Sequence, residues 1–490
     1  MRGRARALFA LAALALALCV GLNVYLSGEQ SKLAYTGEVL YGSREEAEGV
    51  SIAMHAVNSR HQHLNTTYYP VSGENDSEGH WSLATYKWEY GGIEPALSIT
   101  TAGINIGFSW SGGEVERIFE DLEGWQREMA EYARARIDGE SGRWSGKLLL
   151  NDYVDSLPVH LFARCVKGDS TDPENPWANV DVDELFCVPI PGEVWMDVSL
   201  SLSTSDGYSE GELDISPSNG RFVNSDSYSV WASDEYMYFT ALFYTWDENG
   251  ENFELLDGSH LPGGGWGIWR VRCASENGWF YGPTNTETLT ADFDTLESVY
   301  TFPEDWENVQ LTMDESGERL LLLSFQDGEL YLTVIDVASG DVAQQTKLLD
   351  ASETARLDID RHSYADFYTQ DSFTAMLIGN GMVAVANTGA GEYELVCAYD
   401  LTELPAPEWL EAKGNYYWAD DYLFAWDGER IAVYEQGVVD NISSQRAWNE
   451  AYHRLSIFRD GELVYSEWLT TQLDWAYLNN VTREYELKME

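Results

Sequence analysis

Short apolar stretches alternate with two-residue turns from about residue 145 to the C-terminus. The clearest turns are Ser316-Gly317, Asp327-Gly328, Ser339-Gly340, Asp427-Gly428 and Asp460-Gly461. Asp-Gly suits the positive φ angles that two-residue hairpins require. Because hairpin follows hairpin without a helical segment between them, a parallel α/β sheet is excluded. The pattern predicts an all-β fold.

One segment, residues 309–349, is the best-formed repeat unit: VQLTMDESGERLLLLSFQDGELYLTVIDVASGDVAQQTKLL. It reads as four short strands in about 40 residues, which is the size of one propeller blade. The segment resembles blades of WD40-like and quinoprotein-like β-propellers, with weaker echoes at 382–401, 426–430 and 458–461. The resemblance implies a β-propeller-like repeat domain, with roughly five to eight blades by length. The sequence departs from WD40 proteins in lacking a repeat in which Gly-His is followed by Trp-Asp.

The N-terminus begins with Arg2, Arg4 and Arg6, followed by an uncharged run over residues 7–26. Twenty helical residues span about 30 Å, the thickness of a bilayer core. Basic residues on one side predict a cytoplasmic N-terminus and an extracellular C-terminal domain. We therefore expect one transmembrane signal anchor and a single-pass location in the cell membrane. A cleaved signal peptide is the alternative, although its apolar region is usually about 7–15 residues.

Acidic residues number 82 against 29 basic ones, a net charge of -53. Such a surface repels a phosphate backbone, so we expect no nucleic-acid partner. The order of basic start, apolar run and acidic β-rich remainder resembles membrane-anchored β-propeller-like proteins of bacteria. That resemblance carries over no activity. The expected partners are the membrane, through the N-terminal helix, and a protein or an envelope glycan.

We divide the chain into an anchor (1–28), a β-rich N-terminal region (29–140) and a propeller-like domain (141–490). The middle region contains one additional amphipathic helix, expected over residues 114–137. Its apolar side chains recur every three or four residues: Val115, Ile118, Leu122, Trp125, Met129 and Tyr132. Ser111 and Glu114 fit a capping box. We expect this stripe to pack on its own domain.

No catalytic motif is intact, and we assign neither a catalytic residue nor a cofactor. Residues 207–211 (GYSEG) match GxSxG, but proline follows where a nucleophile elbow requires a helix. A hairpin turn is the better interpretation. Residues 245–250 and 312–317 approach the Asp box of sialidase-like propellers, yet each has one residue too many before its glycine. No Walker A motif occurs.

His61 and His63 are the only close histidine pair. On a strand both would face one side, where His55, His80 or a carboxylate would complete a Zn²⁺ site. Exposed loop histidines are the more common explanation of such a pair, and we assign no metal site.

Trp266 and Trp269 follow three glycines in LPGGGWGIWRV. An aromatic ring on a glycine-supported loop is a platform for a sugar or peptide, so we mark this pair as a candidate ligand-binding site. Packing in a β core is the competing explanation, and the more common one for tryptophan. Outside the apolar run lie Cys165, Cys187, Cys273 and Cys397, of which Cys165 and Cys187 are the favoured disulfide pair.

The sequence therefore predicts a membrane-anchored, extracytoplasmic and non-enzymatic binding or scaffold protein. The alternative is an anchored glycan-active hydrolase with carboxylates in the propeller mouth and tryptophans as platforms. The sequence does not select two of its 82 acidic residues as a catalytic pair.

Overall fold

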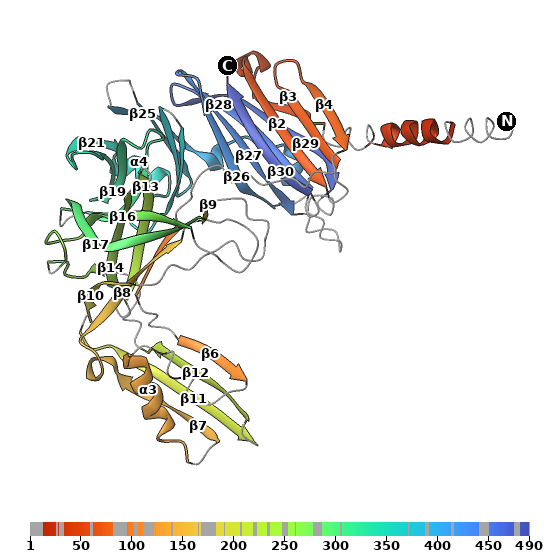
Figure 1. Cartoon of the computed structure of the whole chain (residues 1–490). Helices are drawn as coiled ribbons and strands as arrows, with labels where there is room; N and C mark the ends of the chain where they lie inside the picture. The colour runs from red at the N-terminus through yellow and green to blue at the C-terminus, as the bar shows by residue number, and fades with distance from the viewer. Residues whose placement is uncertain are drawn as a thin grey trace. The chain divides into compact units, whose positions relative to one another are not determined.

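A computed structural model of the whole chain (Figure 1) supplies the fold. It describes residues 13–25, 28, 34–58, 62–81, 96–101, 106–111, 119, 122, 124–138, 141–164, 166–167, 183–190, 192–205, 208–218, 223–232, 236–246, 253–259, 261–277, 287–303, 306–370, 372–387, 392–412, 416–440, 450–474 and 481–489. The described chain is mainly β-strand, arranged in seven antiparallel sheets, four of them four-stranded. Repeated small antiparallel sheets are the units of a propeller-like fold, as the sequence predicts.

The expected transmembrane segment is described only over residues 13–25, which form an exposed helix. Within the described residues, no helix combines the length and the apolar character needed to cross a membrane. The predicted signal anchor and the single-pass membrane location, with a cytoplasmic N-terminus, are therefore corrected. Residues 1–12, which carry the three arginines, lie outside the described part.

The chain divides into two compact units, one of residues 1–87 with 352–490 and one of residues 88–351. This division differs from the predicted boundaries at 28 and 140, which remain predictions about the sequence. The first unit contains both ends of the described chain.

Three sheets build the first unit. The first runs β1 (Thr36–Gly42), β29 (Glu462–Asp474), β28 (Glu450–Arg459), β27 (Arg430–Asp440), β26 (Tyr416–Trp426). The second runs β30 (Val481–Met489), β2 (Val50–Asn58), β3 (Gln62–Tyr69), β4 (Glu74–Trp81). The third runs β22 (Ala365–Gln370), β23 (Phe373–Ile378), β24 (Gly381–Asn387), β25 (Tyr393–Asp400). Short helices complete the unit: η1 (Arg44–Ala47), α4 (Ala351–Arg356), η3 (Leu401–Glu403) and α5 (Glu408–Ala412).

The two ends of the chain pair within this unit, since β30 lies beside β2 and β1 beside β29 (Figure 1). The alternation of strand side chains decides what faces the core. On β2, Ile52, Met54 and Ala56 are buried, whereas Ala53 and His55 between them are half-buried. The buried set packs against Leu455, Tyr465 and other residues of the five-stranded sheet. The opposite face of β2 is left for polar side chains.

Four sheets build the second unit. The first runs β10 (Asp183–Pro189), β8 (Ser156–Arg164), β5 (Ala96–Thr101), and the second runs β6 (Ile106–Ser111), β12 (Tyr208–Pro217), β11 (Trp195–Ser205), β7 (Gly142–Leu149). The third runs β13 (Val223–Ala232), β14 (Tyr236–Trp246), β16 (Gly267–Asn277), β17 (Glu287–Thr301), β9 (Val166–Lys167), with β15 (Phe253–Leu255) beside β14. The fourth runs β18 (Glu307–Met313), β19 (Arg319–Gln326), β20 (Glu329–Asp336), β21 (Val342–Leu349). One short helix, η2 (Leu150–Asp152), follows β7.

The last of these sheets confirms the predicted unit over residues 309–349, since its four strands pair in sequence order. The turn between β19 and β20 has φ values of 50° at Asp327 and 84° at Gly328. Asp460 and Gly461 repeat this geometry with 52° and 79°. Positive φ at both central residues is what a type I′ turn requires, and Asp-Gly tolerates it.

The predicted helix over 114–137 is confirmed in part as α3 (Gly124–Arg134), which ends three residues before the predicted bound. Phe119 is also helical, whereas residues 114–118, 120, 121 and 123 lie outside the described residues. Trp125, Met129 and Ala133 are buried on the side that faces β11 and β7. The stripe therefore packs on its own unit, as expected.

Candidate functional site

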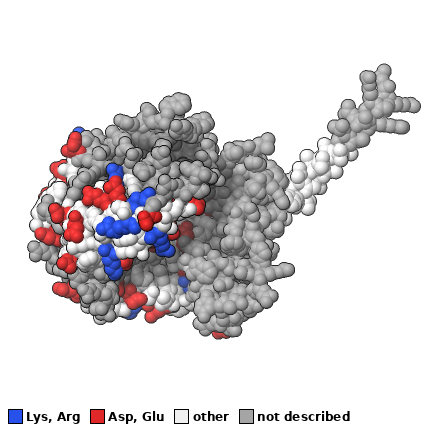
Figure 2. All heavy atoms as spheres, turned by 90° about the horizontal axis from the view of Figure 1, so that it is seen from below, with Lys and Arg blue, Asp and Glu red and all other residues white. Residues whose placement is uncertain are grey.

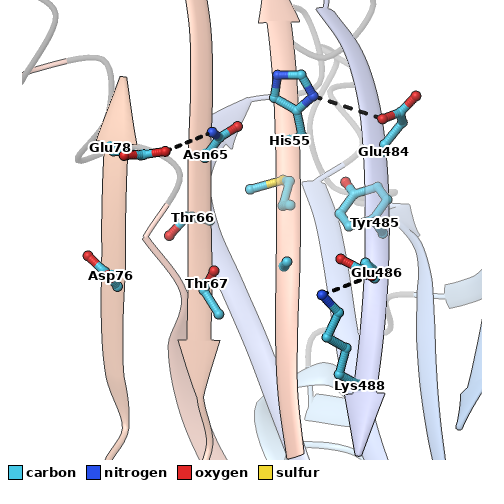
Figure 3. Close-up of a pocket in the computed structure, with 12 residues that line it drawn as sticks. His55, Asn65, Thr66, Thr67, Asp76, Glu78, Glu484, Tyr485, Glu486 and Lys488 are labelled. Carbon is cyan, nitrogen blue, oxygen red and sulfur yellow. Dashed lines mark hydrogen bonds and ion pairs between the residues drawn. The ribbon is translucent and has the colours of Figure 1, made fainter. Parts of the chain in front are cut away.

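An open groove of about 720 Å³ lies on the face of sheet β30-β2-β3-β4 that the core leaves free (Figure 3). It belongs wholly to the first unit. Twelve residues line it: Ala53, Met54, His55, Asn65, Thr66, Thr67, Asp76, Glu78, Glu484, Tyr485, Glu486 and Lys488. Carboxylates therefore stand on the two outer strands, with an amide, hydroxyls and an imidazole between them.

Strand register sets these side chains in rows across the sheet. In one row, Glu78 lies opposite Asn65, Asn65 opposite His55, and His55 opposite Glu484. Two residues along, the row is Asp76, Thr67, Ala53 and Glu486. Because alternate residues of a strand share a face, both rows project into the groove. Three strand spacings, about 14 Å, separate the β4 carboxylates from those on β30.

Each wall of the groove carries its own contacts. On β30, Lys488 Nζ lies 3.0 Å from Glu486 Oε1, and His55 Nδ1 lies 3.9 Å from Glu484 Oε2. On β4, Asn65 Nδ2 donates to Glu78 Oε1 at 3.2 Å. Figure 3 shows these pairs along the groove. The Glu484 side chain is 46% exposed, so water reaches it.

The charge of the groove limits what it binds. Four carboxylates face one lysine, so an anionic ligand would be repelled, whereas a neutral polar or cationic ligand would not. In the view of Figure 2, acidic side chains are scattered over the described surface, and several basic side chains gather in one region.

Three histidines extend the same face. His63 stacks on His80 with ring centroids 5.0 Å apart and on His55 at 5.6 Å. The sequence suggests His55 and His80 as partners of His63, and the structure brings these three together. His61 lies outside the described residues. In the described part of the chain, however, no group of three or more His, Cys, Asp or Glu side chains is arranged to hold a metal ion.

A buried carboxylate, Glu467, lies on the core side and is fully enclosed. It accepts hydrogen bonds from Tyr68 Oη at 2.9 Å and Tyr465 Oη at 2.7 Å, and it pairs with Arg44. Burial raises the pKa of Glu467 above its ordinary value and raises that of Tyr68 to about 12. Since the cluster is enclosed and joins η1 to β3 and β29, it holds the two chain ends together.

A second buried ion pair lies on the other face of the five-stranded sheet. Arg454 Nε donates to Glu435 Oε2 at 3.1 Å, and both side chains are about 3% exposed. Tyr452 Oη donates to the same carboxylate at 2.5 Å. Burial raises the pKa of Tyr452 above its ordinary value, and the negative charge of Glu435 raises it further. Burial among these partners makes this pair structural.

Trp266 and Trp269, the candidate ligand platform, lie in the core of the second unit. They are 6% and 0% exposed. Each indole N–H donates to a backbone carbonyl, Trp266 to Leu256 at 2.6 Å and Trp269 to Pro262 at 2.9 Å. This placement agrees with core packing, and neither ring lines the groove.

The GxSxG match, the second Asp box candidate and Cys397 all have structural explanations. Tyr208 to Gly211 begin β12, paired with β11, so the GxSxG match lies in a hairpin and not in a strand-to-helix turn. At the second Asp box candidate, Asp314 Oδ1 accepts from the amides of Glu318 and Arg319 at 3.0 Å, which stabilises the β18–β19 turn. Cys397 is buried with a free thiol. The favoured Cys165–Cys187 pair and the Cys273 side chain lie outside the described residues.

The groove is missed at the level of sequence because its walls come from opposite ends of the chain. Glu484 and Glu486 belong to β30, and Asp76 and Glu78 to β4. The only sequence signal is that both segments alternate acidic residues with other residue types, in EYELK and ENDSE. With so many acids in the chain, this pattern does not stand out.

No known protein family matches the sequence, and no curated protein matches it either. Among solved structures, the chain is similar to a prolyl endopeptidase at 10% identity and a TM-score of 0.22, covering 91% of this chain and 50% of that one. It is similar to a protein described as a 6-phosphogluconolactonase from Bacteroides uniformis, at 10% identity and a TM-score of 0.26, covering 85% and 99%. It is also similar to a periplasmic gluconolactonase of Pseudomonas aeruginosa, at 11% identity and a TM-score of 0.23, covering 67% of this chain and 94% of that one. The chain spans half the length of the prolyl endopeptidase.

The sequence predicts a non-enzymatic binding or scaffold protein, and this expectation is not upheld: the structures named above carry the names of enzymes. At TM-scores of 0.22 to 0.26 these similarities assign no activity to this chain.

Proposed function

We propose that the protein is a hydrolase that cleaves a neutral or cationic glycan bound across the groove of sheet β30-β2-β3-β4. The observation that carries the proposal is the pair Glu484 and Glu486 on one wall, each with a different partner. Glu484 has His55 at 3.9 Å, and Glu486 has Lys488 at 3.0 Å.

The positions of Glu484 and Glu486 along β30 suit this chemistry. Alternate residues on one strand are about 7 Å apart along its axis. Inverting glycosidases separate their acid and base by roughly 6.5–9.5 Å, which leaves room for a water molecule beside the sugar. A sugar bound over β30 would therefore have a carboxyl group on each side of its anomeric carbon.

The partners divide the roles between the two carboxyl groups. In the protonated form, Glu484 gives its proton to the leaving glycosidic oxygen as the C–O bond breaks. Glu486, whose Oε1 lies 3.0 Å from Lys488 Nζ, accepts a proton from the water that attacks the anomeric carbon. His55 is positioned to exchange a proton between Glu484 and solvent after each turnover.

The rest of the groove would bind the substrate. Asn65 and Thr67 on β3 offer an amide and a hydroxyl between the walls, and Asp76 and Glu78 accept hydrogen bonds from sugar hydroxyls. The net negative charge of the groove favours neutral or amino sugars over uronic or sulfated sugars.

Release of reducing ends from a panel of neutral, amino and acidic oligosaccharides tests this function. We expect turnover of a neutral or amino glycan, and a loss of about 10²–10⁴-fold in kcat for Glu484→Gln and Glu486→Gln. Glu297→Gln is the matched control, because Glu297 also pairs with a cation, Arg270, at 2.9 Å, but outside the groove. Absence of turnover on every glycan, or equal activity in all three variants, would rule out the proposal.

A further inference from the structure

Sheet β6-β12-β11-β7 of the second unit has one covered face and one open face. Met196, Val198 and Leu200 of β11 are buried on the side where α3 packs. The intervening Trp195 and Asp197 are exposed, and Ser199 and Ser201 are half-buried. The open face is therefore made by alternate residues of all four strands.

The open face carries its charges in two separate strips. The basic strip is Arg143 and Lys147 on β7. The acidic strip is Glu210, Glu212 and Asp214 on β12. Between them, β11 contributes Asp197, which lies 3.8 Å from Lys147 Nζ, and the small side chains of Ser199, Ser201 and Ser203. The register sets Arg143 opposite Ser201 and Ser201 opposite Glu212, so one strand separates the two charges in that row.

These charges are little neutralised within the subunit. Arg143 and Glu212 are exposed, and among the described residues neither side chain has an ion-pair partner. Lys147 approaches Asp197 only at 3.8 Å, with both side chains more than half exposed. A chain with 53 excess negative charges thus keeps two basic residues, one unpaired and one loosely paired, beside an acidic strip on a single open face of its described part.

We propose that this face binds a second copy of the same chain. A two-fold axis along β11 carries β7 of each copy over β12 of the other, because both strands flank β11 at one strand spacing. Arg143 then faces Glu212 of the second copy, and the same contact forms twice. The two β11 strands approach closely at Ser199, Ser201 and Ser203. The two Asp197 carboxylates also meet at the axis, each beside Lys147 of its own copy.

The same axis brings Trp195 against its counterpart. Trp195 lies at one end of the open face on β11 and is 39% exposed. It supplies the apolar contact that a polar interface needs near its axis. Four strands about 4.8 Å apart and some eight residues long cover roughly 500 Å² per copy. Stable interfaces bury about 800 Å² per partner, so the dimer is weak and concentration-dependent.

Sedimentation velocity of the full chain over a range of concentrations tests the proposal. We expect a monomer–dimer equilibrium in the wild type. Arg143→Glu and Glu212→Arg, each alone, convert two attractions into two repulsions, so the dissociation constant rises by about tenfold or more. Lys347→Glu is the control, because it makes the same charge change as Arg143→Glu on β21, outside this face.

Mixing the two single variants makes the test decisive. In a mixed dimer, one row joins the two substituted positions, whose charges are opposite, and the other row keeps the original Arg143 and Glu212. Both rows are therefore attractive, so a heterodimer forms although each variant alone is monomeric. A wild type that stays monomeric overturns the proposal. So does a wild-type dimer that resists both reversals, or a mixture of the two variants that does not associate.

Discussion

His55 Nδ1 lies 3.9 Å from Glu484 Oε2, and this contact joins a strand near the start of the chain to its last strand. The pair sits on the open face of the sheet, with the His55 side chain 29% exposed. A histidine beside a carboxylate, both reached by water, is a suitable arrangement for proton transfer.

Replacing His55 tests its role in proton exchange. We expect His55→Gln to lower kcat on a cleaved glycan by about tenfold to a hundredfold, with little change in KM, because the side chain serves Glu484 and does not bind the sugar. Steady-state kinetics measure both constants. A rise in KM at unchanged kcat would instead assign His55 to substrate binding.

Glu467 makes stability depend on pH. Its folded pKa is raised by burial, so its contribution to stability is fully present below the unfolded pKa and is lost as pH rises through the folded pKa. In Glu467→Gln the side chain does not titrate, so this loss of stability with rising pH does not occur. We expect the wild type to lose free energy of unfolding relative to this variant as the pH rises above about 4.3, the ordinary pKa of glutamate.

Denaturant unfolding of both proteins across a series of pH values measures the difference. Glu74, an exposed residue of β4, provides the control in Glu74→Gln. A stability difference that is constant with pH, or that grows in favour of the wild type, would contradict the assignment.

Arg454 and Glu435 form the most enclosed ion pair described in the five-stranded sheet. Arg454→Met leaves the Glu435 carboxylate buried without its cation, and we expect a loss of about 3–5 kcal/mol in the free energy of unfolding. Adding Glu435→Gln removes the buried charge and should restore part of this stability. Thermal unfolding of the two variants measures both effects, and an unchanged Tm for Arg454→Met would show that the pair contributes nothing.

Cys397 should be chemically silent in the folded protein. Burial raises the pKa of its thiol to about 12, so very little thiolate exists at pH 8. Cys19, exposed and free, is the internal control. Alkylation followed by peptide mass spectrometry should label Cys19 within minutes and Cys397 only after denaturation. Equal labelling rates would contradict the packing around Cys397.

What the sequence predicts well is local. The β18–β21 sheet follows from its turns, because Asp327 and Gly328 determine the hairpin with little help from distant residues. Helix α3 follows from its apolar period, and the first predicted turn, residues 114–118, lies outside the described residues. Both are decided by neighbours in the chain.

The groove is not predicted from the sequence, and the expected membrane-spanning helix is not found among the described residues. Glu484 and Glu78 share a row only because β30 pairs with β2 and β4 with β3, which is a property of sheet order and register. No periodicity within either segment reveals that pairing. Trp266 and Trp269 are candidate ligand-binding residues only because of their residue type and the glycines before them. Residue type does not distinguish a buried ring from an exposed one.

The stereochemistry of the product tests the central claim most directly. Proton NMR of a cleaved glycan, recorded within the first minutes, identifies the anomer released before mutarotation. Glu484 and Glu486 are two residues apart on β30, about 7 Å along the strand, and this spacing predicts inversion at the anomeric carbon and loss of that product with Glu486→Gln. Retention of configuration, or cleavage that persists in Glu486→Gln, would contradict the assignment of Glu484 and Glu486.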